Sequence, residues 1–286
     1  MIQSDLPDTI NAVQVTQLIE MALSEDLGTD GDITSSSTVP EDMQFTGVMA
    51  ARHEMVVAGL WLTERVFHAV DTAIMWTPDV KDGDFVKAGT VLGRVRGPGR
   101  ALLTAERTAL NFLQNLCGIA TLSKTYVDAV DGTGATILDT RKTQPGYRDL
   151  AKYATRMGGA TNHRMRLDDL VLIKDNHVAV AGSIEAAVNS AKAAGHTKIE
   201  VECDTLEQVC EAVALDVDAI LLDNMGLREL REAVTIISGR ARSEASGGVT
   251  LDTVRAIAET GVDSISIGRL TQSAPACDIG LDWNAD

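Results

Sequence analysis

The sequence predicts an α/β protein with two domains, of which the C-terminal one is an incomplete barrel of parallel strands. The 286 residues are enough for two domains of ordinary size. From residue 135 onward, six short apolar runs typical of buried strands are separated by runs with helical periodicity. This alternation is typical of a parallel sheet built from right-handed βαβ units.

Composition limits the classes of partner. A net charge of -16 disfavours binding to nucleic acid and to anionic membranes. No apolar run approaches the roughly 20 residues that span a bilayer, and the first residues lack the basic and apolar regions of a signal peptide. The cysteines show no paired spacing, so we expect reduced core thiols and a cytoplasmic protein. They are Cys117, Cys203, Cys210 and Cys277.

The N-terminal part predicts a mixed α/β region. Apolar residues recur at helical spacing over 11–26, and a polar loop is expected over 29–37. A strand is predicted over 44–52, a helix over 60–70 and a second strand over 73–77. These elements predict a domain that is distinct from the periodic C-terminal part.

Residues 81–97 alternate small turns with short apolar pieces, a texture shared with biotinyl and lipoyl carriers. The segment lacks a lysine in a tight turn flanked by the Met or Ala of a carrier motif, so we interpret it as scaffold. Helical periodicity follows over 102–130, and Gly118 predicts a break into two helices.

We place the domain boundary in this helical connector. The predicted domains are residues 1–115 and 116–273. The tail, 274–286, contains no further βα unit, and we expect it to return to the N-terminal domain.

The C-terminal domain is too short for a closed barrel. A complete eight-stranded α/β barrel takes about 250 residues, so six strands predict an open one. The predicted strands are 135–139, 170–174, 198–202, 219–223, 242–246 and 264–268.

Polar residues gather where these strands end. Ligands of parallel α/β barrels bind at the carboxyl ends of the strands, because the βα loops converge there. The residues in strand order are Asp139 to Lys142, Lys174 to His177, Glu202, Asp223 and Asn224, Ser246 to Gly248, and Gly268 and Arg269.

The first two strand ends lie in a basic window, residues 138–177. The window contains eight Lys/Arg and five Asp, which makes it 8 − 5 = +3 in an acidic chain. It also contains His163 and His177. A local positive field of this kind favours a small anionic ligand over a polyanion, although a solvated basic face is the simpler alternative.

Acidic and glycine-containing strand ends allow two interpretations each. Glu202 and Asp223 could cap the following helices, or ligate Mg²⁺ carried by a phosphorylated substrate. The glycines at 246–248 and at 268 could form plain turns, or let backbone N–H groups approach a phosphate. Two such loops after the last two strands match a recurring phosphate site of barrels.

Lys174 also allows two interpretations. A lysine at a buried strand end can form a Schiff base, as in class I aldolases. Together with Arg141, Lys142, His163 and Arg164 it could instead bind more than one carboxylate. The residues alone indicate an enzyme that binds phosphate and carboxylate.

Longer motifs resemble a known family, quinolinate phosphoribosyltransferase, over nearly the whole chain. The motifs are GDITS, LLTAERTALNFLQNLCGIAT, DTRKTQPGYRDLAKYA, GGATNHRMRLDDLVLIKDNH, KIEVECD, ILLDN, EASGGV and SIGRLTQSA. The resemblance implies an N-terminal α/β sandwich, an incomplete C-terminal α/β barrel and homodimers with shared active sites, which in turn could form hexamers. It further implies that quinolinate and phosphoribosyl pyrophosphate, with Mg²⁺, give nicotinate mononucleotide, CO₂ and pyrophosphate for NAD synthesis.

The resemblance also implies roles for individual residues. Arg107 would enter the neighbouring subunit's pocket, and Lys142 or Lys174 would steer the decarboxylation. Glu202 and Asp223 would serve the ribose and Mg²⁺. Quinolinate would be contacted by Thr140, Arg141, Lys142, His163, Arg164 and Lys174, and phosphate by Ser246, Gly247, Gly248, Ile267, Gly268 and Arg269. The chain departs from the family pattern at Arg269 and Gln272.

Three alternatives stay open on the sequence alone. The first is a phosphoribosyltransferase for another pyridine or aromatic acid, including relatives associated with molybdenum transport. The second is a Schiff-base aldolase centred on Lys174. The third is a carrier or binding module centred on residues 81–97.

Overall fold

The computed structural model describes residue 7 and residues 10–285. Its internal contacts divide the chain into two compact units. The first comprises Met1–Lys124, Gln144–Gly159 and Ser273–Asp286, and the second Thr125–Thr143 and Ala160–Gln272. The boundary predicted near residue 115 lies inside one helix, α4 (Gly99–Ala129).

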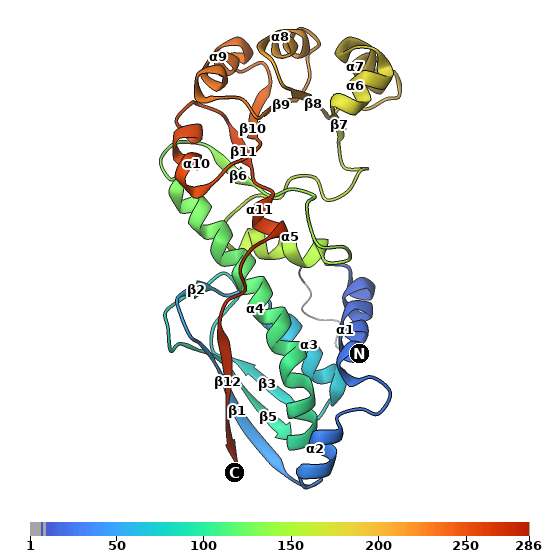
Figure 1. The fold of residues 1–286 in the computed structure, drawn as a ribbon, viewed down its shortest axis with the longest axis vertical. Helices are drawn as coiled ribbons and strands as arrows, with labels where there is room; N and C mark the ends of the chain where they lie inside the picture. Colours follow the sequence, from blue (N-terminus) through green and yellow to red (C-terminus); the bar gives the residue numbers. More distant parts are fainter. Residues whose placement is uncertain (1–6, 8–9, 286) are drawn as a thin grey trace. The chain divides into compact units, whose positions relative to one another are not determined.

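The first unit is built on a four-stranded antiparallel sheet in the order β12-β1-β5-β3. The tail strand pairs with the first strand along its whole length, with Ala51 opposite Ile279 (Figure 1). The expected return of the tail to the N-terminal domain is therefore confirmed. The strands are β1 (Gln44–Ala51), β3 (Met75–Pro78), β5 (Val91–Pro98) and β12 (Ile279–Ala285), and β2 (Met55–Val56) pairs with β4 (Phe85–Val86).

Helices complete this unit: α1 (Ala12–Leu27), α2 (Ile33–Thr38), α3 (Leu60–Val70) and α4. Helix α2 lies where a polar loop was expected, and that expectation was wrong. The Asp32 carboxylate caps the helix by accepting from the backbone N–H of Ser35 at 2.8 Å, and it also accepts from Thr104 Oγ1 at 3.0 Å. A side-chain cap can start a short helix in a sequence without apolar periodicity.

Helix α4 is continuous, so the predicted break at Gly118 was also wrong. A Cβ at Gly118 would lie 2.0 Å from the Pro275 carbonyl oxygen. The glycine is explained by the close approach of the tail segment to the helix, rather than by a helix end.

Helix α5 (Arg148–Met157) follows the first predicted barrel strand, where the alternation of strands and helices predicts a barrel helix, but it belongs to the first unit. Leu150, Ala151 and Ala154 are part of the hydrophobic core that also includes the α3 and α4 side chains. The Tyr153 hydroxyl donates to Asp82 at 2.5 Å, and the same carboxylate accepts from the first backbone N–H groups of α3. Asp82 lies in the 81–97 segment, so its turn has a structural role.

The second unit contains six parallel strands in the order β6-β11-β10-β9-β8-β7. Strands β6 and β7 are the two edges of this sheet, so the barrel is open as predicted. The strands are β6 (Thr136–Leu138), β7 (Val171–Ile173), β8 (Ile199–Cys203), β9 (Ala219–Asp223), β10 (Arg242–Ser246) and β11 (Ser264–Ser266).

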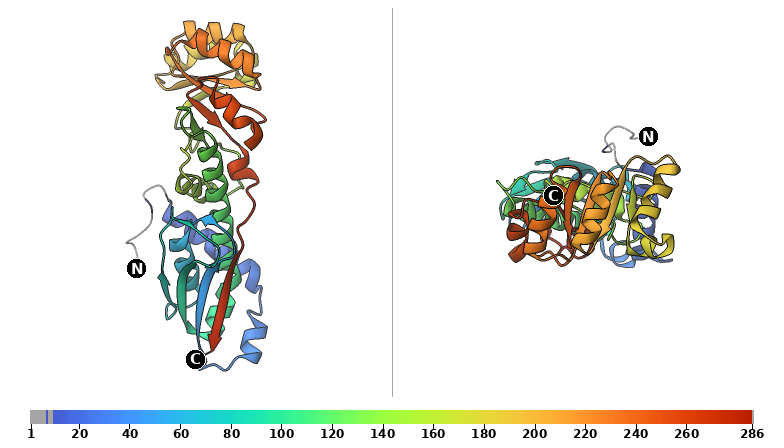
Figure 2. Two further views of the ribbon diagram at one scale, coloured as in Figure 1. Left: turned by 90° about the vertical axis from the view of Figure 1, so that its left-hand side faces the viewer. Right: turned by 90° about the horizontal axis from the view of Figure 1, so that it is seen from above.

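Helices follow these strands and line one face of the sheet (Figures 1 and 2). They are α7 (Ile184–Ala193), α8 (Leu206–Ala214), α9 (Leu227–Ile237) and α10 (Leu251–Ala258), with the short α6 (Asp175–Ala181) and α11 (Arg269–Gln272). Sequence analysis missed α6. His177 caps this helix because its Nδ1 atom accepts the backbone N–H of Lys174 at 2.9 Å.

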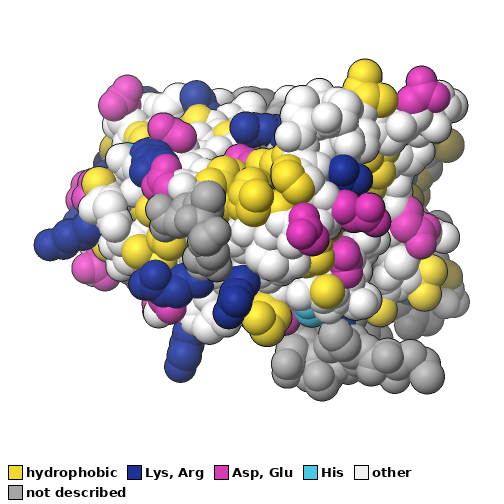
Figure 3. All heavy atoms as spheres, turned by 90° about the horizontal axis from the view of Figure 1, so that it is seen from below, with side chains coloured by type: hydrophobic (Ala, Val, Ile, Leu, Met, Phe, Trp, Pro, Cys, Tyr) yellow, Lys and Arg dark blue, Asp and Glu magenta, His cyan; other side chains and the backbone are white. Residues whose placement is uncertain are grey.

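Two surface features concern the partners that the composition disfavours, membranes and nucleic acid. Among the described residues, no helix combines the length and the apolar composition needed to cross a bilayer. On the face drawn in Figure 3, acidic and basic side chains of the described residues are interspersed with hydrophobic ones.

Candidate active site

A cavity of about 410 Å³ lies at the carboxyl ends of the strands of the second unit. Strands β7 to β11, or the residues directly following them, contribute to its wall, and β6 contributes through the loop that begins two residues after it. The lining residues are Thr140, Arg141, Lys142, His163, Arg164, Leu172, Lys174, Glu202, Leu221, Asp223, Glu244, Ser246 and Ser266. Nine of these were predicted from the sequence as site residues.

A buried carboxylate, Asp139, connects the two basic segments of the wall. It follows β6 directly and accepts the backbone N–H of His163 at 2.9 Å and the Asn162 side chain at 2.6 Å. The adjacent loop is fixed by Thr140 Oγ1, which accepts the backbone N–H of Lys142 at 3.0 Å. Residues 140–142 and 162–164 are therefore held together although they are separated in the sequence.

Two guanidinium groups, those of Arg141 and Arg164, lie in this wall, and Arg164 donates to the Leu170 carbonyl at 3.2 Å. Burial lowers the pKa of Arg164, and the positive charge of Arg141 lowers it further. The Nε atom of Arg141 is buried and has no hydrogen-bond acceptor among the described residues. A buried donor without an acceptor is costly, so an anionic ligand that reached it would be strongly favoured.

Acidic residues oppose these cations across the cavity. The Lys174 ammonium forms an ion pair with the Glu202 carboxylate, which is mostly buried. Asp223 Oδ2 accepts from the Asn224 side chain at 2.6 Å. Glu202 and Asp223 end neighbouring strands, and their carboxylate oxygens are ligands of the type that Mg²⁺ prefers.

The glycines predicted for phosphate binding differ in their surroundings. Gly247 has φ +94°, and a Cβ there would lie 2.1 Å from Asn224 Oδ1. Gly248 has φ +59° and open space around it. A Cβ at Gly268 would lie 2.8 Å from the Lys142 side chain, so this glycine allows the lysine to pack closely.

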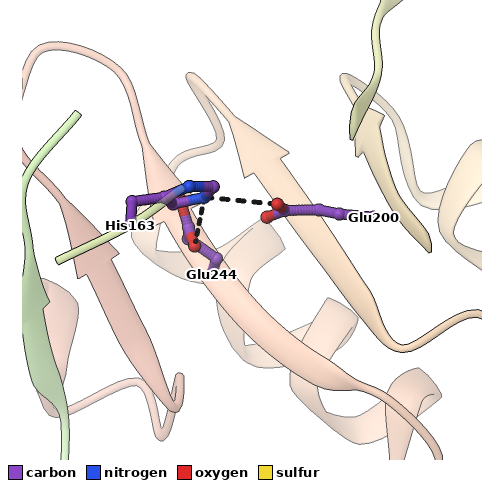
Figure 4. A group of neighbouring side chains, drawn as sticks. All are labelled: His163, Glu200 and Glu244. Carbon is purple, nitrogen blue, oxygen red and sulfur yellow. Dashed lines mark ion pairs between the residues drawn. The ribbon is translucent and has the colours of Figure 1, made fainter. Parts of the chain in front are cut away.

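His163 lies between two buried glutamates, Glu200 of β8 and Glu244 of β10 (Figure 4). Its Nε2 atom is 3.2 Å from Glu200 Oε2 and 3.4 Å from Glu244 Oε2, and all three side chains are at most 10% exposed. Burial acts to lower the pKa of His163, but the two carboxylates outweigh burial and raise it to about 9. Burial raises the pKa of Glu200.

The other ring nitrogen of His163 has a different neighbour. Nδ1 accepts the backbone N–H of Arg164 at 2.7 Å, which favours the neutral ring protonated on Nε2 alone. The two carboxylates favour a second proton on the ring, and that proton would break the contact between Nδ1 and Arg164. Both protonation states keep a proton on Nε2.

The remaining predicted residues lie outside the cavity wall. Arg107 is an exposed residue of α4 in the first unit. Ile267 is buried, and Arg269 is exposed at the start of α11. The phosphate-binding roles proposed for Gly247, Gly248, Ile267, Gly268 and Arg269 stay predictions.

The sequence did not single out the residues that lie two positions before the polar strand ends. Glu200 precedes Glu202 by two positions, and Glu244 precedes Ser246 by two. Side chains two apart in a strand share a face. An acidic residue two positions before a polar residue at a strand end was therefore the signal for Glu200 and Glu244. The same rule finds Leu172, Leu221 and Ser266.

Family models match most of the chain. Residues 32–117 match the N-terminal domain of quinolinate phosphoribosyl transferase, and residues 119–282 match its C-terminal domain. The chain belongs to the quinolinate phosphoribosyltransferase family. The fold class expected from the resemblance, an N-terminal α/β domain with a parallel-stranded α/β domain, is thereby confirmed together with the structural likeness below.

Relatives in the family are similar over most of their length. A decarboxylating quinolinate phosphoribosyltransferase of Nicotiana tabacum is 42% identical, covering 92% of this chain and 81% of the relative. A probable carboxylating nicotinate-nucleotide pyrophosphorylase of Bacillus subtilis is 41% identical, covering 96% and 94%. The solved nicotinate-nucleotide pyrophosphorylase of Francisella tularensis is 37% identical with a TM-score of 0.93, covering 99% of this chain and all of the other.

Proposed function

We propose that this chain transfers a phosphoribosyl group from phosphoribosyl pyrophosphate to quinolinate and releases CO₂, giving nicotinate mononucleotide and pyrophosphate for NAD synthesis. The family and the names of its relatives support this reaction. The observation that carries it in the structure is the convergence of Arg141, Lys142, Arg164 and Lys174 on one cavity of about 410 Å³. These cations suit a small dicarboxylate.

The reaction requires chiefly that the two substrates are held in the correct orientation. The pyridine nitrogen of quinolinate attacks C1 of the ribose as the C1–O bond breaks, and pyrophosphate leaves with the bonding electrons. The nitrogen then carries a positive charge, so the carboxylate at the adjacent carbon leaves as CO₂ and its electron pair remains on the ring. A proton taken up at that carbon completes nicotinate mononucleotide. No side-chain nucleophile is needed, and the protein contributes orientation and electrostatic stabilisation.

The roles of the residues follow from their positions. Arg141 and Arg164 bind the carboxylates, and the unpartnered Arg141 Nε becomes satisfied when they do. Lys142 or Lys174 holds the departing carboxylate until the ring becomes positive. Thr140 keeps the backbone of Lys142 in place through its 3.0 Å hydrogen bond.

We propose Mg²⁺ as the metal that accompanies phosphoribosyl pyrophosphate, with Glu202 and Asp223 as its protein ligands. The donor set fits, because Mg²⁺ usually takes one or two carboxylates and completes its shell with phosphate oxygens and water. When bound, Mg²⁺ would neutralise charge on the pyrophosphate. Lys174 already pairs with Glu202 and keeps this carboxylate pointed into the cavity.

We further propose that the enzyme works as a homodimer in the cytoplasm and that Arg107 completes the neighbouring subunit's site. The exposed guanidinium of Arg107 forms no hydrogen bond or ion pair with the described part of its own chain, which suits a residue that acts on another subunit. Symmetric dimers are the commonest oligomers. Four free cysteines, three of them buried, suit a reducing compartment.

One assay tests the reaction. Purified protein with quinolinate, phosphoribosyl pyrophosphate and Mg²⁺ should release CO₂ and pyrophosphate in equal amounts, and nicotinate should be a much poorer substrate. Pyrophosphate release with nicotinate, and without CO₂ from quinolinate, would assign the chain to a different pyridine. The family of the chain disfavours the Schiff-base alternative, in which Lys174 would be the nucleophile.

A further inference from the structure

The cluster of His163, Glu200 and Glu244 connects three separate parts of the second unit. Glu200 lies in β8 and Glu244 in β10, with β9 between them in the sheet. His163 lies in the segment that follows α5 and precedes β7. Asp139 and the β-bridge between Leu138 and Thr161 also hold that segment to this unit.

The proton on Nε2 of His163 makes the interactions within this cluster attractive. Two carboxylate oxygens at 3.2 and 3.4 Å face one ring nitrogen, a spacing in which one N–H is shared between two acceptors. Without that proton, two buried carboxylates would face a lone pair, and the cluster would be repulsive.

The cluster also separates two cavities. His163, Arg164 and Glu244 line both the candidate active site and a second cavity of about 760 Å³ within the same unit. Glu200 lines only the second cavity. A ligand in the candidate active site therefore touches the wall that contains Glu244, whereas any effect of Glu200 on that ligand passes through its neighbours.

We infer that Glu200 and Glu244 are positioning residues, which act by binding the Nε2–H of His163 and so fixing the place of Arg164 in the quinolinate site. His163 and Arg164 are adjacent, and the Arg164 backbone N–H contacts the His163 ring at 2.7 Å. A shift of the ring would therefore move the guanidinium that lines the cavity. This inference rests on the proposed function, because it assigns the role to the site that binds quinolinate.

The same three side chains have donor atoms close enough to hold a metal ion. A metal would need the Nε2 lone pair, so the proton between the carboxylates would have to leave. The two interpretations thus differ in a single observable, the occupant of the space between Nε2 and the carboxylates.

A double-mutant cycle tests the positioning role. Glu200→Gln and Glu244→Gln should each weaken quinolinate binding about tenfold, the size expected for one hydrogen bond to a charged group. In a His163→Gln background each change should have an effect of less than about twofold, because residues that act through one another are not additive. The steady-state effect should fall on KM for quinolinate more than on kcat.

Controls separate a structural loss from the proposed role. Glu232→Gln, at an exposed position of α9, should leave quinolinate binding unchanged. Thermal unfolding should show that each variant is folded at the assay temperature. A tenfold effect that persists in the His163→Gln background would overturn the proposal, since the glutamates would then act on the ligand independently.

Spectroscopy on the wild-type protein without substrate gives an independent test. In protein labelled with ¹⁵N-histidine, Nε2 of His163 should show a one-bond coupling to a proton, and the metal content should be far below one ion per chain. A stoichiometric metal, with Nε2 lacking a proton, would refute the inference. If the wild type fails to turn over quinolinate while Nε2 carries its proton, the proposed function is wrong, but the hydrogen bonding of His163 to the two glutamates is confirmed.

Discussion

At the scale of single residues, the wall of the site combines cations with carboxylates that already have partners. Arg141 has a buried Nε without an acceptor, and Arg164 has a pKa lowered by burial and by Arg141. Glu202 and the Glu200–Glu244 pair are already bound to cations or donors. The unsatisfied Arg141 Nε–H is therefore a donor that an anion in this cavity can use.

Lys174→Ala should lower kcat/KM for quinolinate by about 100-fold or more, the size seen when one charged or hydrogen-bonding group is removed from a preorganised site. The loss has two sources, because the change removes a cation from the cavity and leaves Glu202 without its ion-pair partner. Steady-state kinetics would measure the effect. Lys87→Ala, an exposed lysine of the first unit, is the matched control and should behave as wild type.

The pH dependence of stability should report His163. Its pKa is raised to about 9 from an ordinary value of 6.5, so the folded protein holds a proton that the unfolded chain releases. This contribution is fully present below pH 6.5 and is lost as pH rises through 9. The raised pKa of Glu200 acts in the same direction.

Urea unfolding of wild type and His163→Gln between about pH 6.5 and 9.5 tests this sign. The free energy of unfolding should fall more steeply with pH in the wild type than in the variant. Equal slopes would show that the imidazole is neutral in the folded protein throughout this range.

At the scale of elements, α4 shows how a tertiary contact overrides a local signal. Glycine is a poor helix former, which is why Gly118 predicted a break. The helix continues because its packing on the tail segment requires the absence of a side chain at this position. The same reasoning explains Gly158, where a Cβ would lie 2.1 Å from the Ala120 carbonyl oxygen.

Gly118→Ala should therefore destabilise the protein, although alanine favours an isolated helix by about 1 kcal/mol. The clash with the Pro275 carbonyl should cost more than that gain, for a net loss of about 1–3 kcal/mol. Thermal unfolding measures it, and Asn111→Ala at an exposed position of the same helix is the control. A variant as stable as wild type would mean that the tail moves away at little cost.

At the scale of the whole molecule, the tail makes the first unit discontinuous in sequence. Strand β12 extends the sheet next to β1, and Trp283 donates from its ring nitrogen to Glu106 of α4 at 2.9 Å. The first unit can therefore be completed only after the barrel strands have been synthesised. Residues 144–159 also belong to the first unit, although they lie in the sequence between two segments of the second unit.

The proposed shared site gives a prediction for the assembled enzyme. Arg107→Ala and Lys142→Ala should each be inactive as homodimers, since each removes a cation that the proposed site requires. Mixing the two variants should restore activity, because a mixed dimer contains about one intact site. Subunit exchange must be verified by mass or by labelled chains, and exchange without recovered activity would show that Arg107 does not act in trans.

Much of the barrel and nine residues of its cavity wall could be predicted from the sequence. The period of two in the strands and of 3.6 in the helices predicted the six strands and the helices between β7 and β11, because each buried face needs apolar side chains at a fixed spacing. Parallel strands then bring residues such as Lys142, Lys174 and Glu202 to one edge. Local sequence therefore suffices wherever a regular element ends in a polar residue.

Tertiary structure alone decided the contacts that have no local signature. Helix α5 follows a barrel strand in sequence, yet its apolar side chains pack on the core of the first unit. Nothing in the local sequence shows that Glu200 and Glu244 lie beside His163, but in the folded protein both are buried next to it. A buried charge is tolerated only beside a partner, and which partner it meets depends on the folding of segments far apart in the chain.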